Sequence, residues 1–255
     1  MPHARREERW KWEMSRRMYG RVIPSLLLAL ILVASMLFAI PTYADNGVTS
    51  VKNKGTGELY EDLENVPPEG SYGDTIIVKG SGVIAGKTVE LYWDLVQAWD
   101  GEAGLLNSTK ADAAGEYEIW FRVPEAVSSK QKDHYIWIRD VEANQYVKVG
   151  FIVEPVIKLS PSSGLPGDTI TVNGYGFGDE VEVTVTIQDA GYSKELATKV
   201  DTNDLGSFST TFKVPDYPFY TYTITAEDNA EDSNTAEADF TIGPSITISP
   251  EEGPS

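Results

Sequence analysis

Acid–base chemistry has few candidate residues in this chain. His134 has Asp133 and Asp140 nearby, and the second histidine is His3. There is no cysteine, and no serine stands in a G-x-S-x-G motif, so the usual nucleophiles for such a base are missing. Carboxylates are plentiful, yet a glycosidase pair needs a cleft that separates the pKa values of its acid and its base. We therefore expect no catalytic residue and no enzyme activity.

Two acidic segments carry the oxygen ligands that calcium prefers. Their candidate ligands are Asp201, Asn203, Asp204, Asp228 and Asp232. Leu205 interrupts the ligand spacing of the first segment, and no glutamate closes it. A turn rich in Asp, Asn and Gly before a strand explains the same residues without a metal. We expect no cofactor, and calcium in these segments or at a junction between modules is the weaker alternative.

Aromatic side chains are the residues that could bind a partner through a surface. If Val89, Leu91 and Trp93 face inward, strand alternation directs the ring of Tyr92 outward. The same alternation directs Tyr135 and Trp137 outward from a neighbouring strand, and Trp120 outward from the opposite sheet. Exposed rings stack on sugars and anchor protein interfaces, so these four residues are the candidate binding residues. Cross-strand aromatic pairing, or burial against residues 45–65, is the structural alternative.

Strands must position these side chains, because apolar and polar residues alternate with period two. Val183, Val185 and Ile187 alternate with polar residues, as do Phe208, Phe212 and their neighbours. Such runs have one buried and one wet face. Gly, Pro, Asn and Asp interrupt them at short intervals. This pattern predicts several short strands and no long helix beyond the first 44 residues.

The sequence repeats itself at intervals of about 90 residues, which is typical of tandem modules. Residues 68–82 match 162–176, residues 115–124 match 206–215, and residues 151–155 match 240–244. The pattern begins again at residues 246–253, which match 157–164. We therefore expect modules at 66–155 and 156–244, followed at 245–255 by the start of a truncated third repeat. Residues 45–65 are expected to form a linker or leading arm.

The N-terminus has the pattern of an export signal. Arginines and lysines precede an apolar run at residues 22–40, and Thr42 and Ala44 fit the small-x-small rule for cleavage. We expect a signal peptide at residues 1–44. The alternative is an uncleaved membrane anchor, because the run is close to the ~20 residues that span a bilayer. Both predictions place the remainder outside the cytoplasm, at the cell surface or secreted.

The formal net charge of −18 excludes one class of partner. A strongly acidic surface repels phosphate backbones and anionic lipid headgroups. We expect no nucleic-acid partner, and contact with a membrane only through the N-terminal segment if it stays uncleaved. A cell-surface glycan or protein is the partner class that remains, and the charge also serves solubility.

Residues 160–177, with glycines at 164, 167, 174 and 176, resemble the opening of prokaryotic immunoglobulin-like repeats of the IPT/TIG-like, early-set kind. Residues 203–208, 214–215 and 222–226 resemble the later strands of those repeats. The likeness is weaker over residues 66–155, where Val83 replaces the aromatic Phe177. Such repeats recur in secreted and cell-surface proteins as stalks, spacers or adhesion modules. The resemblance implies fold and location more than activity.

The predicted fold is therefore all-β: two tandem immunoglobulin-like β-sandwich domains after an N-terminal signal helix. The expected function is that of a non-catalytic extracellular spacer in a prokaryotic surface or secreted protein. One alternative is an adhesion module that binds carbohydrate or protein through the aromatic face of the first domain. A second alternative is an accessory part of a larger extracellular enzyme.

Overall fold

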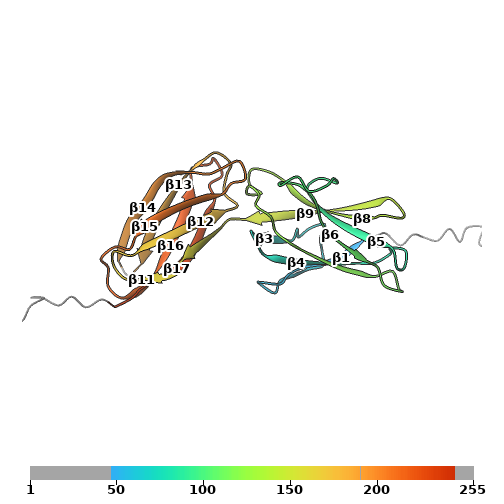
Figure 1. Cartoon of the computed structure of the whole chain (residues 1–255), viewed down its shortest axis with the longest axis horizontal. Helices are drawn as coiled ribbons and strands as arrows, with labels where there is room; N and C mark the ends of the chain where they lie inside the picture. Colours follow the sequence, from blue (N-terminus) through green and yellow to red (C-terminus); the bar gives the residue numbers. More distant parts are fainter. Residues whose placement is uncertain (1–46, 190, 245–255) are drawn as a thin grey trace, which may run out of the picture. The chain divides into compact units, whose positions relative to one another are not determined.

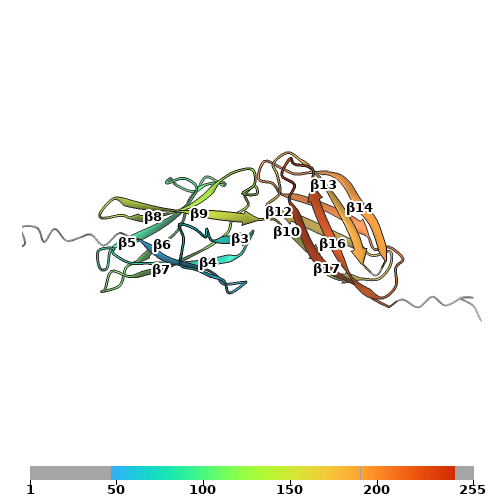
Figure 2. The same cartoon turned by 180° about the vertical axis from the view of Figure 1, so that it is seen from behind.

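The computed structural model describes residues 47–189 and 191–244. Regular structure in this part of the chain consists of seventeen strands, arranged as two β-sandwiches (Figures 1 and 2). The prediction of an all-β fold with two immunoglobulin-like sandwiches is confirmed. Both sandwiches belong to one compact unit that begins at Asn46. The predicted signal peptide and the opening of the third repeat lie outside the described residues.

In the described residues, no helix has the length and apolar character needed to cross a bilayer.

The first sandwich packs a four-stranded sheet, in the order β2-β1-β4-β7, on a five-stranded sheet, in the order β3-β9-β8-β5-β6. Its strands are β1 (Val48–Asn53), β2 (Leu59–Tyr60), β3 (Glu69–Ser71), β4 (Thr75–Gly80), β5 (Thr88–Trp93), β6 (Gly104–Lys110), β7 (Tyr117–Arg122), β8 (His134–Asp140) and β9 (Gln145–Glu154). Neighbours in these sheets are antiparallel, apart from β3 and β9, which run parallel.

The second sandwich packs a three-stranded sheet, in the order β10-β12-β15, on a five-stranded sheet, in the order β11-β17-β16-β13-β14. Its strands are β10 (Val156–Ser160), β11 (Ser163–Gly164), β12 (Thr169–Tyr175), β13 (Glu182–Asp189), β14 (Tyr192–Asp201), β15 (Phe208–Lys213), β16 (Tyr220–Asp228) and β17 (Thr235–Ile242). The parallel pair of the first sandwich recurs here as β11 and β17.

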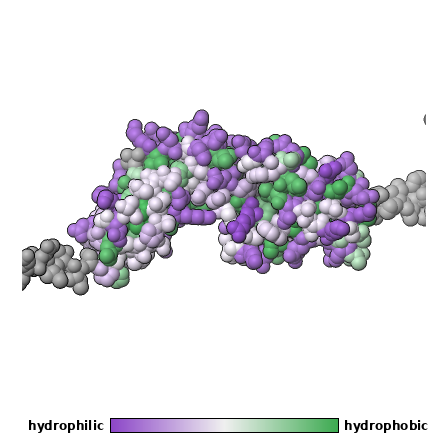
Figure 3. All heavy atoms as spheres, in the orientation of Figure 1, coloured by the Kyte–Doolittle hydropathy of each residue, from purple (hydrophilic) through white to green (hydrophobic). Residues whose placement is uncertain are grey.

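Each sandwich encloses its own apolar core between its two sheets. The strict alternation of buried and exposed residues along the strands provides the core side chains. On β7, buried Tyr117, Ile119 and Phe121 alternate with exposed residues. Trp93 is fully buried at the centre of the first core and contacts the rings of Phe121 and Phe151. Phe177, Tyr222 and Phe240 are the largest fully buried side chains of the second core. The space-filling view of Figure 3 accordingly shows a surface on which hydrophobic residues form small separate groups.

Residues 45–65, expected to form a linker or leading arm, instead contribute β1 and β2 to the first sandwich. Val48–Asn53 forms β1, which pairs with β4 inside the first sandwich, and Val51 is fully buried. The spacing of Val48 and Val51 does not have period two. The register shifts between Val48 and Ser50. Because a β-bulge inserts one extra residue into a strand, both valines contact the core.

Candidate functional site

The predicted aromatic face exists in part, on the outer surface of the five-stranded sheet of the first sandwich. Tyr135 and Trp137 lie two residues apart on β8 and are both half-buried. Lys148 on β9 extends over them, with its Nζ 3.8 Å from the centre of the Tyr135 ring and 5.5 Å from that of Trp137. A cation above an aromatic face is attracted by the ring quadrupole. The surface is therefore a pair of rings covered by one cation.

Asp94, the residue after β5, accepts a hydrogen bond from each of these two residues. Trp137 Nε1 donates to the Asp94 carbonyl at 2.9 Å, and the Tyr135 amide donates to the Asp94 carboxylate at 2.9 Å. The Tyr135 hydroxyl donates to Asp133 at 3.2 Å. The negative charge of Asp133 raises the pKa of Tyr135 above its usual value, so this phenol stays protonated and keeps its donor.

Two of the four candidate rings do not join this surface. Tyr92 lies opposite Trp137 across the β5–β8 ladder, but only 5% of it is exposed, so the expectation of an accessible ring is wrong. Packing of its cross-strand neighbours covers a ring that alternation alone would direct to solvent. Trp120 is 55% exposed on β7, which belongs to the opposite sheet. It borders a separate shallow depression with Ile77 and Arg122.

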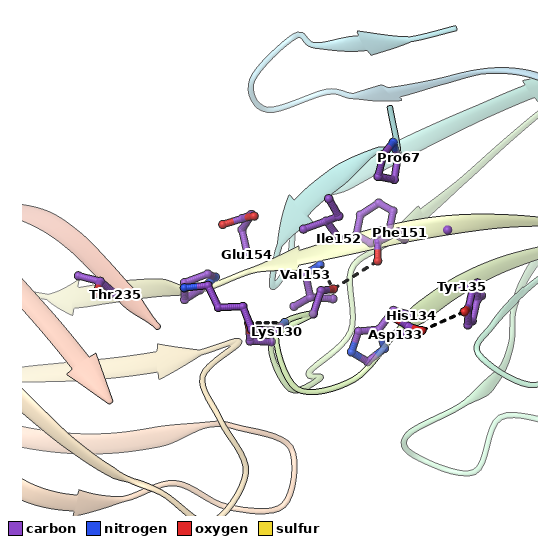
Figure 4. A pocket seen from close by; sticks show the side chains of 14 residues that line it. Pro67, Lys130, Asp133, His134, Tyr135, Phe151, Ile152, Val153, Glu154 and Thr235 are labelled. Atoms are coloured by element: carbon purple, nitrogen blue, oxygen red, sulfur yellow. Dashed lines mark hydrogen bonds between the residues drawn. The ribbon is translucent and has the colours of Figure 1, made fainter. Parts of the chain in front are cut away.

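A depression of about 530 Å³ begins at Tyr135 and follows β9 (Figure 4). Its lining residues are Pro67, Ser128, Ser129, Lys130, Asp133, His134, Tyr135, Gly150, Phe151, Ile152, Val153, Glu154, Pro155 and Thr235. Gly150 pairs with Tyr135 across the ladder and leaves open space where a side chain would stand. Figure 4 shows Tyr135 and Asp133 at one end, and Lys130 and Glu154 toward the other. This volume could hold a small ligand beside one aromatic ring.

His134 forms part of the core and is not placed as a general base. Its ring is 2% exposed and stacks on Trp93 at a centroid distance of 5.2 Å. Nδ1 lies 2.9 Å from the Asp94 carboxylate, and Nε2 lies 2.9 Å from the Val127 carbonyl. Both ring nitrogens are thus engaged by the fold. No nucleophilic side chain hydrogen-bonds to His134 among the contacts of the described residues.

Two of the five calcium candidates, Asn203 and Asp228, accept hydrogen bonds from the backbone around them. The Asn203 side-chain oxygen accepts from the amides of Leu205 and Ser207 at 3.1 and 2.8 Å. Asp228 is 4% exposed, and its carboxylate accepts from Gly178 and Asn234 at distances between 2.7 and 2.9 Å. Asp201 and Asp232 are exposed. Within residues 47–189 and 191–244, no three His, Asp or Glu side chains are grouped to hold a metal.

The junction between the sandwiches lies at Pro155, where the modules expected at 66–155 and 156–244 adjoin. β9 ends at Glu154 and β10 begins at Val156, so Pro155 alone separates them. The Ser128 amide donates to the Phe177 carbonyl at 3.0 Å. The Tyr72 ring stacks on Tyr175 at a centroid distance of 4.0 Å.

Further contacts join the same two surfaces. Lys158 Nζ donates to the Tyr72 carbonyl at 3.0 Å, and Ser207 donates to Glu125 at 3.3 Å. Asn234 donates to Gln131 at 3.3 Å. Each sandwich thus fixes the other through backbone, ring and side-chain contacts. The absence of a linker follows from the adjoining bounds of the two repeats in the sequence, whereas the residues that make these contacts could not be predicted from it.

No family model matches the sequence, and no curated protein is similar to it. Among solved structures, a tetra-tandem repeat from the extending region of a large adhesion protein is similar at 15% identity and a TM-score of 0.29, with 67% of this chain and 45% of that one covered. The dimeric latent PorU of Porphyromonas gingivalis is similar at 16% identity and a TM-score of 0.31, with 78% of this chain and 20% of PorU covered. The D0-D1 domain of intimin is similar at 14% identity and a TM-score of 0.25, with 76% of this chain and 98% of the intimin domain covered.

The chain thus spans less than half the length of the first two structures. At such low identities and TM-scores, these likenesses assign no activity, substrate or partner to the chain.

Proposed function

We propose that the two sandwiches act as a stiff, non-catalytic spacer in an exported surface or secreted protein of a prokaryote. The junction is the observation that carries this proposal. A spacer must hold its modules at a fixed angle, and a flexible linker would lose that angle within a few residues. Here a single proline connects the modules, and proline restricts its own backbone.

The contacts on either side of Pro155 support the same function. Bending at the junction would break the Ser128–Phe177 hydrogen bond and separate the stacked rings of Tyr72 and Tyr175. Aromatic stacking adds about 0.5–1.5 kcal/mol to the burial of the rings. A junction with several such contacts has little freedom to bend.

Double electron–electron resonance tests the stiffness directly. The chain has no cysteine, so spin labels at Lys110→Cys and Glu237→Cys, one exposed residue in each sandwich, are the only labels. We expect a narrow distribution of distances between the two labels. The matched control carries a Gly/Ser segment of about six residues after Pro155, which should broaden the distribution because such segments behave as random coils.

Equally broad distributions in the natural chain and in the control would disprove the spacer function. A narrow distribution that broadens in Tyr72→Ala, but not in Tyr146→Ala, would assign the stiffness to the junction. Tyr146 is a suitable control because it is 42% exposed on β9 and contacts Arg139 of its own sandwich.

A second candidate function is adhesion through the surface of Tyr135 and Trp137. The depression of about 530 Å³ beside Tyr135 favours it, because a ring next to a cavity suits the apolar face of a sugar. A glycan array with the natural chain and with Tyr135→Ala/Trp137→Ala tests it. Specific binding that the double variant loses, and that Trp120→Ala on the opposite sheet keeps, would establish adhesion. No bound glycan would leave the spacer as the function.

Three finer assignments accompany this proposal. The glycine pattern of residues 160–177 supports membership of the IPT/TIG-like, early-set repeats. The basic and apolar segments of residues 1–44 support export through a signal peptide. A catalytic domain elsewhere in the same protein would make these modules accessory domains. Expression in a bacterial host, with N-terminal sequencing of the exported chain, tests the predicted cleavage after Ala44.

A further inference from the structure

One end of the second sandwich exposes a group of aromatic and apolar side chains. We call it the distal pole and define it as Leu165, Tyr192, Tyr217, Phe219 and Tyr220. Phe219 is 66% exposed, Tyr220 48% and Leu165 46%. The elements that carry them meet: Tyr220 pairs with Ile242, and the amide of Gly243 donates to Gly164, next to Leu165. Exposed apolar groups of this kind mark interaction surfaces.

Equivalent hydrogen bonds show which part of the first sandwich corresponds to the distal pole. His134 on β8 and Tyr222 on β16 occupy equivalent positions, because they precede by the same number of residues Asp140 and Asp228, which pair with Val89 and Val183 in the two ladders. The His134 ring bonds the Val127 carbonyl, and the Tyr222 hydroxyl bonds the Pro218 carbonyl at 3.1 Å. The residues that follow these carbonyls, Ser128 and Phe219, therefore occupy the same place in their sandwiches.

A second pair of hydrogen bonds gives the same correspondence for the neighbouring turn. The Gly73 amide donates to Val123, and the Gly167 amide donates to Val214, at 2.9 and 2.8 Å. Tyr72 therefore corresponds to Pro166, and Leu165 lies beside it in the same turn. In the first sandwich both equivalent positions, Ser128 and Tyr72, contact the second sandwich.

The sequence after the second sandwich indicates which module would occupy the distal pole. It leaves the second sandwich at Pro244 as it leaves the first at Pro155, and residues 246–253 then repeat the opening pattern of residues 157–164. We propose that the distal pole docks a third β-sandwich of this repeat type, the one that residues 246–253 open. This inference rests on the proposed spacer function and extends it by one module.

The chemistry of the two junctions differs. Beside its stacked tyrosine rings, the first junction uses hydrogen bonds of the Ser128 backbone amide and of the side chains of Glu125, Gln131 and Lys130. At the distal pole the exposed side chain of Phe219 stands at the position of Ser128, so the second junction gains an apolar side chain at this position. An apolar contact is stabilised by removing surface from water and is less sensitive to salt than a polar one.

Cysteine labelling tests the docking. Asp216→Cys places a thiol at an exposed residue that corresponds to Glu125 of the first junction. The natural chain is compared with a chain in which a second copy of residues 156–244 follows Pro244 and stands in for the third sandwich. We expect maleimide labelling of Asp216→Cys to slow by about tenfold or more in the extended chain, a protection of about 1.4 kcal/mol. Labelling of Tyr146→Cys should proceed equally in both chains.

Adding Phe219→Ser to the extended chain separates apolar from polar docking. This variant removes the exposed ring of Phe219, so recovery of fast labelling would assign the docking to the apolar side chains of the pole. Equal labelling of Asp216→Cys in the natural and extended chains would overturn the inference. So would protection that persists in Phe219→Ser. A narrow label distance across the first junction would at the same time leave the spacer function standing, so the two proposals fail separately.

Discussion

At the residue scale, the two sandwiches share a contact between a glycine and an aromatic ring on the next strand. A β carbon at Gly80 would lie 2.2 Å from the Tyr117 hydroxyl, and one at Gly174 would lie 2.0 Å from the Phe208 ring. Neither glycine has a positive φ, so space alone requires the absence of a side chain here. The ring fills the volume that a side chain on β4 or β12 would take, and the core closes at its end.

Gly80→Ala should therefore destabilise the first sandwich by about 1–3 kcal/mol through overpacking. Urea unfolding followed by tryptophan fluorescence measures it, because the tryptophans of the described residues all lie in the first sandwich. Gly150→Ala is the matched control, since nothing lies within 4 Å of its added carbon. Equal midpoints for the two variants would show that the Tyr117 ring moves aside at little cost.

Tyr117 also carries a buried hydroxyl without a hydrogen-bond partner among the described residues. Burial raises the pKa of Tyr117 above its usual value. An unfolded tyrosine ionises near pH 10, whereas the folded one does so at higher pH. The unfolded state then binds fewer protons, so stability is complete below about pH 10 and falls as pH rises above it.

Tyr117→Phe should reduce this alkaline loss of stability. It should also leave stability at pH 7 unchanged or raised by up to about 1 kcal/mol, because an unpaired buried hydroxyl is removed. Urea unfolding of the natural chain and the variant between pH 8 and 11 measures both effects. Parallel pH profiles would contradict the assignment of the alkaline loss to Tyr117.

At the scale of elements, a buried carboxylate fixes the end of β16. Asp228 joins the Gly178 amide before β13 to Asn234 before β17, and Asn234 is fully buried. The charge is stabilised because four N–H groups face its two oxygens. An aspartate that looks like a calcium ligand in the sequence is thus an internal cap.

Asp228→Ala should destabilise the second sandwich by about 3 kcal/mol, because the donors that it binds lose their acceptor inside the protein. Asp232→Ala, on the exposed part of the same loop, should change stability by less than about 0.5 kcal/mol. Urea unfolding followed by tyrosine fluorescence measures both variants. A stabilisation of the natural chain by calcium that Asp228→Ala abolishes would instead support the metal prediction.

Strands and core were predictable from the sequence, whereas contacts between distant residues were not. Period-two alternation identified Val89, Leu91 and Trp93 as buried, because side-chain direction follows from the backbone alone. The burial of Tyr92 depends on its cross-strand neighbours. β1 was missed because its bulge hides the alternation. For the site, alternation placed Tyr135 and Trp137 on one face, but Lys148 and the depression depend on the pairing of β8 with β9.

At the scale of the whole molecule, the junction couples the stability of the two sandwiches. Tyr72 and Tyr175 belong to different sandwiches, and desolvation by burial is the main cause that raises the pKa of Tyr175. Each ring therefore depends on the other module for part of its burial. Ser128 and Phe177 couple the backbones in the same way.

Tyr175→Ala in the second sandwich should therefore destabilise the first sandwich by about 1 kcal/mol, the value of one aromatic pair. Thermal unfolding followed by tryptophan fluorescence reports the first sandwich alone. Tyr192→Ala is the control, because the Tyr192 ring contacts that of Tyr217 within the second sandwich. An unchanged melting temperature of the first sandwich in Tyr175→Ala would mean that the modules unfold independently.

The parallel pairs β3–β9 and β11–β17 have a mechanical consequence. In each sandwich a short early strand, β3 or β11, lies beside the closing strand and runs in the same direction. Tension applied to the two ends of a module pulls these neighbours in opposite directions along their length, so their hydrogen bonds are sheared together and are not opened one after another. Because Glu154 belongs to the pair of the first module and is followed by Pro155 and the second module, a pulling force passes from one clamp to the next with almost no slack chain between them.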